Sequence, residues 1–183
     1  GLIDGPTFTS AISQVAIAAG RDETLPALTG IRLEIEGDTL TLAATDRYRL
    51  AVREIPWKPE QSSISATALI LGRTLNETAK AMTSATEVEL AFSSRDGAVE
   101  SLVGFSGAGR STTTRLIDGE FPKYRSLFPD DSATSAQIEK ASFIDAVKRV
   151  SLVAERNTPI RLSFSSEGLT LEAGTGDEAQ ASE

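Results

Sequence analysis

The sequence of 183 residues contains no cysteine and no histidine. Without cysteine, the chain can form no disulfide, no thiolate nucleophile and no thiolate metal site. Without histidine, it has no imidazole metal ligand, no Ser-His-Asp arrangement and no imidazole base for catalysis near neutral pH. Catalysis would have to rely on carboxylates, lysine, tyrosine, serine or threonine, and we expect no cofactor and no metal ion.

Long apolar runs are also missing. No stretch approaches the roughly 20 apolar residues that a membrane-spanning helix needs, and no signal-peptide pattern opens the chain. We therefore expect no membrane partner. The composition, 40% hydrophobic and 24% charged, is typical of a chain that folds around a core. Because the sequence has no initiator methionine and stops soon after a predicted strand, we expect it to be an internal piece of a longer protein.

Two stretches of the chain are similar to each other. The first begins at Phe8 (FTSAISQVAIAAGRDETLPALTGIRLEIEG) and the second at Phe143 (FIDAVKRVSLVAERNTPIRLSFSSEG). Five residues match at a spacing of 135, and after a loop that is shorter by six residues Ile31-Arg32-Leu33 matches Ile160-Arg161-Leu162. A match that continues from a helix into the following hairpin indicates a duplicated unit with a period of about 130 residues.

Hydrophobic periodicity predicts a mixture of helices and strands. The predicted elements are a helix at 7–20, strands at about 28–36, 39–45, 48–56 and 66–72, a helix at 73–84, strands at 87–92, 100–106 and 110–117, and a third helix within 140–156. The apolar face of the first helix would comprise Phe8, Ile12, Val15 and Ala19. We expect an α+β fold with antiparallel sheets and duplicated β-α-β-β-β halves, with one domain at 1–130 and part of another at 131–183.

Charge is divided unevenly among the predicted elements. The helical stretches 7–21, 73–84 and 140–156 carry net charges of +1, +1 and +2, so the other residues carry −12 within a chain of net charge −8. A neutral-to-basic helical surface beside an acidic body suits loose, sequence-independent contact with a phosphate backbone. A few exposed lysines on short helices would give the same count without that function, so charge alone leaves both interpretations open.

Two motifs stand out from the apolar periodicity. The octapeptide TDRYRLAV, residues 45–52, places hydrogen-bonding and cationic side chains inside a strand-like pattern. Taken alone, it is compatible with an edge strand whose Arg and Tyr stems cover apolar surface. The second motif is DGEFPKYRSLFP, residues 118–129, whose prolines are compatible with a linker between domains.

Together with the repeat, these motifs resemble those of the bacterial sliding clamps, the beta subunits of DNA polymerase III. The resemblance rests on T-D-x-x-R-L-A in a strand and D-x-x-F-P-x-Y-R near the end of a domain, and it extends along nearly the whole chain. It implies a ring of three-domain subunits joined head to tail, with sheets outside and helices around duplex DNA. Residues 1–130 would be the complete middle domain, and 131–183 the N-terminal half of the third.

The same resemblance implies the function. We expect a non-catalytic processivity factor that encircles duplex DNA without reading its sequence, forms a homodimer when full length, and acts in the bacterial cytoplasm. Its lining would touch DNA too weakly to prevent sliding, because retention is topological. The residues expected to face DNA are Gln14, Arg21, Arg73, Lys80, Lys148, Arg149 and Arg156.

A peptide pocket is also implied by the resemblance. It would accept short linear motifs from the replicative polymerase, the clamp loader and repair polymerases, and a further wall would come from a C-terminal tail. The residues that match the pocket are Leu28, Thr45, Arg47, Tyr48, Arg49, Leu50, Pro122 and Leu127. Leucine and proline side chains would take apolar peptide groups, and arginine would bond peptide carbonyls at the rim. Arg47-Tyr48 departs from the Gly-His of many relatives, and we expect the adjacent Asp46 to be a structural acceptor.

The composition is also compatible with functions of two other classes. A carboxylate-based hydrolase such as a glycosidase could draw on the 26 acidic residues, but no spacing singles out a catalytic pair. Seven Phe, two Tyr and one Trp also offer little with which to stack sugars. An extracellular β-rich binding module would fit strands such as RSTTTRL, but the neutral-to-basic helices argue against it.

Overall fold

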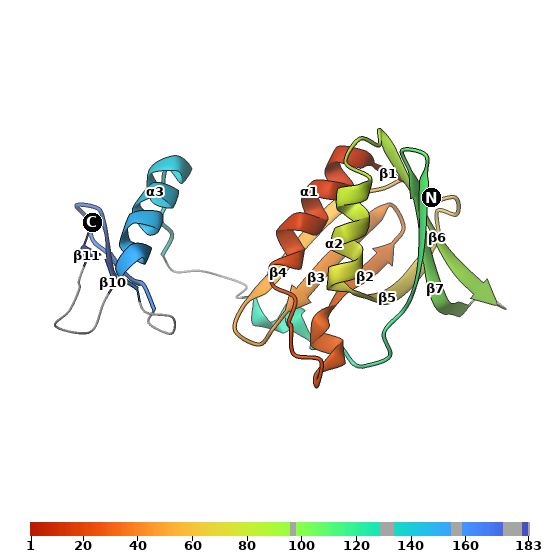
Figure 1. The fold of residues 1–183 in the computed structure, drawn as a ribbon, viewed down its shortest axis with the longest axis horizontal. Helices are drawn as coiled ribbons and strands as arrows, with labels where there is room; N and C mark the ends of the chain where they lie inside the picture. The colour runs from red at the N-terminus through yellow and green to blue at the C-terminus, as the bar shows by residue number, and fades with distance from the viewer. Residues whose placement is uncertain (96–97, 129–133, 155–158, 174–180, 183) are drawn as a thin grey trace. The chain divides into compact units, whose positions relative to one another are not determined.

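The computed structural model describes residues 1–95, 98–128, 134–154, 159–173 and 181–182, of which 94–95, 98–100 and 181–182 are described by their backbone alone. The chain divides into two units, Gly1–Phe128 and Pro129–Glu183. The elements of the first unit, in chain order, are β1 (Leu2–Asp4), α1 (Gly5–Ala16), η1 (Pro26–Thr29), β2 (Gly30–Glu36), β3 (Thr39–Thr45), β4 (Leu50–Pro56), β5 (Ser65–Leu71), α2 (Gly72–Ala81), β6 (Glu87–Arg95), β7 (Ala98–Gly107), β8 (Arg110–Arg115) and η2 (Tyr124–Leu127) (Figure 1).

Two antiparallel sheets form the first unit. Their strand orders are β4-β3-β2-β5 and β1-β6-β7-β8. The helices α1 and α2 lie side by side and cover the first sheet, as Figure 1 shows. The core lies between the helices and both sheets: Ile12 of α1 and Leu75 of α2 are almost wholly buried, and the rings of Phe8 and Phe105 lie 5.6 Å apart between centroids.

The first helix begins and ends earlier than the periodicity predicts. The side chain of Asp4 accepts hydrogen bonds from the backbone N–H of Thr7 (2.9 Å) and from its hydroxyl (2.6 Å), which caps the helix start. The prediction of 7–20 is wrong at the other end, because the helix stops at Ala16 and the backbone N–H of Gly20 donates to the carbonyl of Leu28 (2.7 Å). Ala19 therefore lies in the loop and not on the helical face.

Two predicted strands start too early. The strand predicted from residue 28 begins at Gly30, because the segment that opens with Pro26 forms a 3-10 turn. The strand predicted from residue 48 begins at Leu50, because residues 46–49 form a tight loop. The hairpin between β2 and β3 agrees with prediction: Gly37 has a φ of +58°, a conformation that favours glycine.

The only tryptophan of the chain closes this hairpin. Trp57 follows β4, is 6% exposed, and its ring Nε1–H donates to the carbonyl of Gly37 (2.8 Å). Its backbone N–H donates to the carbonyl of Asp38 (3.0 Å). The turn and the end of β4 are therefore fixed to each other.

The second unit repeats the order of a helix followed by antiparallel strands. Its elements are α3 (Lys140–Val150), η3 (Ser151–Val153), β9 (Arg161–Phe164), β10 (Leu169–Ala173) and β11 (Ala181–Ser182). The sheet order β11-β10-β9 corresponds to β4-β3-β2 in the first unit. Ala146 and Val150 of α3 pack with Leu171 and Ala173 of β10 in a small apolar cluster.

Among the residues that the structure describes, no helix is both long and apolar enough to cross a membrane.

Candidate functional site

The TDRYRLAV motif forms a closed loop between β3 and β4. The carboxylate of Asp46 accepts hydrogen bonds from the backbone N–H groups of Tyr48 and Arg49 (3.1 Å each) and from Nε of Arg49 (3.1 Å). The hydroxyl of Thr45 donates to the carbonyl of Arg49 (2.7 Å) and accepts from the backbone N–H of Arg47 (3.2 Å). The expected role of Asp46 as a structural acceptor is confirmed, and the motif's polar groups largely hold the loop in shape.

The geometry of this loop has two further consequences. Burial opposes ionisation of Asp46, but the hydrogen bonds from Arg49 and Tyr48 outweigh it and lower the pKa of this carboxyl. Arg47 adopts a φ of +81°, a left-handed conformation that is costly for any residue with a Cβ atom. The loop therefore holds its cationic tip in a strained backbone conformation.

A hollow of about 420 Å³ opens beside the loop. Its lining is Ala19, Gly20, Arg21, Asp22, Leu25, Leu28, Asp46, Arg47, Tyr48 and Arg49. Four residues of the predicted peptide pocket are thus together: Leu28 at the half-buried floor, and Arg47, Tyr48 and Arg49 at the exposed rim. Tyr48 as a whole is 90% exposed.

The other four predicted pocket residues do not line this hollow. Thr45 is buried, and Leu50 is half-buried in a second apolar cluster with the rings of Phe121 and Tyr124. Pro122 and Leu127 are exposed, Leu127 to 66%. Their segment nevertheless lies on the same face of the sheet as Leu50, because Tyr124 packs into the cluster that Leu50 joins. A groove between Leu50 and Leu127 stays a prediction.

This face of the sheet is the one turned away from α1 and α2. Side chains alternate along each strand, so Leu33 and Ile35 of β2 point to the helices and Arg32 and Glu34 point away. The cross-strand register pairs Arg32 with Ala43 and Leu69, both in the second apolar cluster. The segment after β8 covers this face.

Glu34 is a residue of this face that the sequence analysis did not single out. Its Oε1 accepts from Nε of Arg32 (2.6 Å), and its Oε2 accepts from the hydroxyl of Tyr124 (3.0 Å) and Nη2 of Arg125 (2.7 Å). Burial would raise the pKa of Glu34, but these three hydrogen bonds together lower it. Burial and the bond to Glu34 raise the pKa of Tyr124 to about 12. The FPKYR motif contains two of these three donors, Tyr124 and Arg125, but gives no sign of a carboxylate that lies 90 residues before Tyr124 in the sequence.

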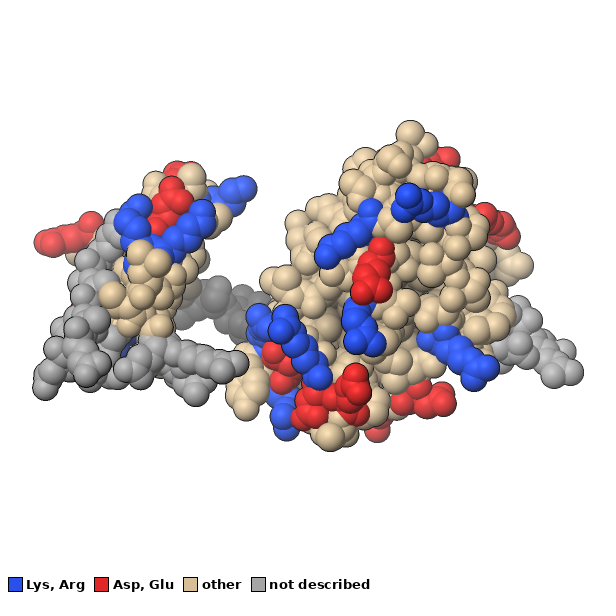
Figure 2. Space-filling model, viewed as in Figure 1, with Lys and Arg blue, Asp and Glu red and all other residues tan. Residues whose placement is uncertain are grey.

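The predicted DNA-facing residues of the first unit lie on or beside the two helices. Gln14 on α1, Arg21 in the loop after it, and Arg73 and Lys80 on α2 are all exposed. Figure 2, which views the unit from the helix side, shows Lys and Arg side chains spread over this face, with Asp and Glu mainly along its edges. Helix α1 itself contains no charged residue.

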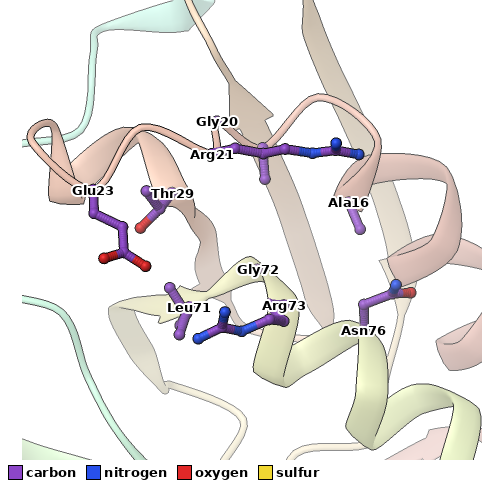
Figure 3. A pocket seen from close by; sticks show the side chains of 10 residues that line it. Ala16, Gly20, Arg21, Glu23, Thr29, Leu71, Gly72, Arg73 and Asn76 are labelled. Carbon is purple, nitrogen blue, oxygen red and sulfur yellow. The ribbon is translucent and has the colours of Figure 1, made fainter.

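A second hollow, of about 380 Å³, lies between the end of α1 and the start of α2. Figure 3 shows Arg21 and Arg73 on two sides of it, with Glu23 on a third. No side chain caps the start of α2, and the positive end of the helix dipole lies at this end. The arrangement favours contact with an anion more than with a cation.

In the second unit, Lys148 and Arg149 are exposed near the end of α3, where cations are favoured by the helix dipole. The ammonium of Lys148 pairs with Asp145 of the same helix (3.4 Å). Arg156 lies outside the described residues. In the part of the chain that the structure describes, no group of three or more acidic residues is placed to hold a metal ion.

Comparisons with known proteins agree with the resemblance noted in the sequence. Residues 2–123 match the family model described as DNA polymerase III beta subunit, central domain, and residues 125–183 match the model of its C-terminal domain. The chain is 62% identical over its whole length to the beta sliding clamp of Streptomyces coelicolor, of which it covers 48%, and 50% identical to that of Micrococcus luteus, of which it covers 58%.

A solved structure supports the fold as well. The crystal structure of the DNA polymerase sliding clamp from Bacillus subtilis superposes on the whole chain with a TM-score of 0.87 at 26% identity, and the chain covers 47% of it. The chain thus spans about half the length of the relatives it matches. With consecutive family models matching almost all of its residues and an antiparallel α+β clamp fold, the chain belongs to the family of DNA polymerase III beta subunits, the bacterial sliding clamps.

Proposed function

We propose that this chain is the middle domain and part of the third domain of a clamp that encircles duplex DNA and tethers the replicative polymerase to it. The observation that supports this most strongly is the order of the family matches, central domain at 2–123 and C-terminal domain at 125–183. The complete subunit would form a homodimeric ring in the bacterial cytoplasm and would act without catalysing a reaction.

The helical face has the physical properties that such a ring needs on its inside. Helix α1 offers uncharged side chains such as Thr9 and Gln14, while α2 adds Arg73 and Lys80. A few separated cations give weak contacts to phosphates without reading bases, which permits sliding. The net charge of −8 keeps the rest of the surface repulsive to DNA.

The hollow beside the 46–49 loop would receive partner peptides. Leu28 provides apolar surface at its floor, and arginine side chains at its rim can donate to peptide carbonyls. Leu50, on the face of the sheet turned away from the helices, and the exposed Leu127 would add further apolar surface. The partners would be the replicative polymerase, the clamp loader and repair polymerases, each through a short motif with apolar anchors.

The DNA contact is tested in the full-length ring with Arg73→Glu combined with Lys148→Glu. Reversing two lining cations should weaken retention on circular DNA, and more strongly at low salt, because attraction to phosphates becomes repulsion. The matched control is Arg115→Glu combined with Lys123→Glu, which makes the same charge change at exposed positions that do not lie on a helix expected to face DNA. Equal retention by both double variants would reject the assignment of the lining.

The peptide contact is tested by calorimetry with a Gln-Leu-x-Leu-Phe peptide and the full-length ring. Leu50→Ala should remove roughly 1–3 kcal/mol of apolar contact, a loss of about ten- to a hundredfold in affinity. Val52→Ala is the control. Val52 lies on the same strand and face as Leu50 and packs against the same cluster, but it is not one of the predicted pocket residues. Arg49→Ala should cost less, because Arg49 is exposed at the rim and already bonded to Asp46.

A further inference from the structure

The segment that carries Pro122 and Leu127 is held against the sheet at its start and in its middle. At its start, the backbone N–H of Ile117 donates to the carbonyl of Leu69 on β5 (2.7 Å). Further along, the rings of Phe121 and Tyr124 are each 3% exposed and meet edge to face at 6.1 Å between centroids. These apolar contacts hold the segment against the sheet.

Apolar contacts alone do not determine how the segment is rotated. Burial of apolar surface is non-directional, whereas hydrogen bonds to a carboxylate require a particular distance and angle. Tyr124 and Arg125 are consecutive residues of η2, and both donate to the same oxygen of Glu34. Two neighbouring side chains bound to one fixed atom determine the orientation of the whole turn.

The acceptor is itself held rigidly. Glu34 lies within β2, which is paired on both sides, and its other oxygen accepts from Arg32 at 2.6 Å. Its side chain is only 14% exposed, so solvent competes little for these bonds. The guanidinium of Arg32 also lies 6.0 Å from the centroid of the Phe121 ring, and that of Arg125 lies 5.7 Å from the Tyr124 ring. The charged and aromatic contacts therefore form one connected group.

From this group we infer that Glu34 is a positioning residue for the peptide groove, by which we mean the predicted groove between Leu50 and Leu127. By holding η2, Glu34 sets where Leu127 and Pro122 lie relative to Leu50. The inference rests on the proposed peptide-binding function. Glu34 does not line the hollow beside the 46–49 loop, and it would act on the peptide only through Tyr124 and Arg125. The residue is thus distinct from the groups that would touch the peptide.

The first test compares Glu34→Gln with Glu36→Gln in the full-length ring, using the same Gln-Leu-x-Leu-Phe peptide. An amide offers one acceptor oxygen and presents a donor to the arginines, so the turn should lose its fixed orientation. We expect peptide affinity to fall about tenfold for Glu34→Gln, the effect of losing one charge-assisted bond. Glu36 lies on the same strand and is exposed, and it acts on Arg125 only through its charge, as the weakest of the influences that shift the pKa of that side chain. Glu36→Gln should therefore change peptide affinity much less than Glu34→Gln.

The second test asks whether the effect passes through Tyr124. Tyr124→Phe removes one hydrogen bond to Glu34 and leaves the ring packed, so it should also weaken peptide binding, and it replaces Glu34→Gln as the test if that variant does not fold. In the double variant the two losses should not add, because both break the same connection. Losses that add fully would show that the two residues act independently and would overturn the inference.

A spectroscopic measurement reports the contact directly in this chain, which has two tyrosines. At about pH 11, Tyr124 should remain largely protonated in the unmodified chain, since burial and the bond to Glu34 raise its pKa to about 12. In Glu34→Gln it should ionise at a lower pH than in the unmodified chain, because burial alone then raises its pKa. Both proteins carry Tyr48→Phe, which leaves Tyr124 as the only tyrosine of the chain, and circular dichroism confirms that both are folded. Equal ionisation in both would show that Glu34 does not hold Tyr124.

The outcomes separate this inference from the function on which it rests. If the unmodified full-length ring binds no peptide, the proposed peptide groove is wrong. If the unmodified ring binds and Glu34→Gln binds with equal affinity, the groove stands and the positioning role of Glu34 is wrong. Loss of binding in Glu34→Gln with normal retention on DNA supports both.

Discussion

The two copies of the repeated unit have the same order of elements but very different burial. In the first copy, α1 is followed by β2 and β3, and Phe8 and Leu33 are 2% and 1% exposed. In the second, α3 is followed by β9 and β10, Phe143 is only half-buried, and Leu162, which corresponds to Leu33, is 39% exposed. Similar sequence has produced similar elements without producing a similar core.

The reason lies in what packs against each copy. In the first unit, α2 lies against α1, and β5 pairs with β2 on the side that β3 leaves open. In the described part of the second unit, the sheet contains β11, β10 and β9, and no strand pairs with the other side of β9. The local sequence pattern therefore decides which helices and strands form. The elements that pack against them from the other half of the same domain decide how much apolar surface they bury.

The largest expected effect tests this contrast directly. Phe8→Ala should lower the free energy of unfolding of the first unit by about 3–5 kcal/mol, because it leaves a cavity beside Phe105 in a closed core. Phe143→Ala, the same change at the matching position, should cost about 1 kcal/mol, since a half-buried ring loses less contact. Urea unfolding followed by circular dichroism measures both. Equal losses would mean that the second copy has a core as closed as the first.

A smaller expected effect on the free energy of unfolding comes from a charged residue of the first copy that has no charged counterpart in the second. The position in the second copy that corresponds to Glu34 is Ser163, which is exposed. Glu34→Gln should cost about 1–3 kcal/mol at pH 7, the value of bonds to a charged acceptor, while Ser163→Ala should change little. The pKa of Glu34 is lowered in the fold, so its contribution is present above the ordinary value of 4.5 and is lost as the pH falls through the lowered value.

The pH dependence of the stability difference between the unmodified chain and Glu34→Gln serves as the control for this prediction. Unfolding by urea at a series of pH values should show the difference between the unmodified chain and Glu34→Gln shrinking below about pH 4. A difference that stays constant down to pH 3 would show that the ionised carboxylate is not the source of the stability.

The smallest expected effect concerns the loop at 46–49, whose counterpart in the second copy falls in residues that the structure does not describe. Arg47→Gly should stabilise the first unit by up to about 1 kcal/mol, because glycine adopts a positive φ without strain and this gain exceeds its entropic cost. Tyr48→Gly, the adjacent change, should instead destabilise it slightly. Thermal unfolding of the two variants would show which is more stable, and a lower stability of Arg47→Gly than of the unmodified chain would contradict the prediction.

The elements that could be predicted from the sequence are those whose signals are local. The predicted strands at 28–36 and 39–45 leave two residues for the β2–β3 turn, where Gly37 has a positive φ, and Phe8, Ile12 and Val15 mark the helix face that is buried. The helix end is not predictable in the same way, because alanines continue to position 19 without a stop signal, whereas the helix ends at Ala16 and the N–H of Gly20 bonds to Leu28 outside it.

The candidate site was less predictable because its contacts are not local. The family motif pointed to the 46–49 loop and to the FPKYR segment, but an alternating strand gives no sign that Glu34 on its outward face meets Tyr124. By pattern alone, Arg32 and Glu34 resemble the solvated side of a half-buried strand. Arg32 and Glu34 are covered because the segment after β8 crosses this face of the sheet, and nothing in the local sequence specifies the course of that segment.

The position of the single tryptophan makes the two units optically unequal. Trp57 lies in the first unit, is nearly buried, and bonds the turn of the β2–β3 hairpin. Its fluorescence emission should therefore shift to longer wavelength when the first unit opens, and should not respond to events confined to the second. Emission and far-ultraviolet ellipticity recorded on one sample would thus separate the melting of the two units without any label.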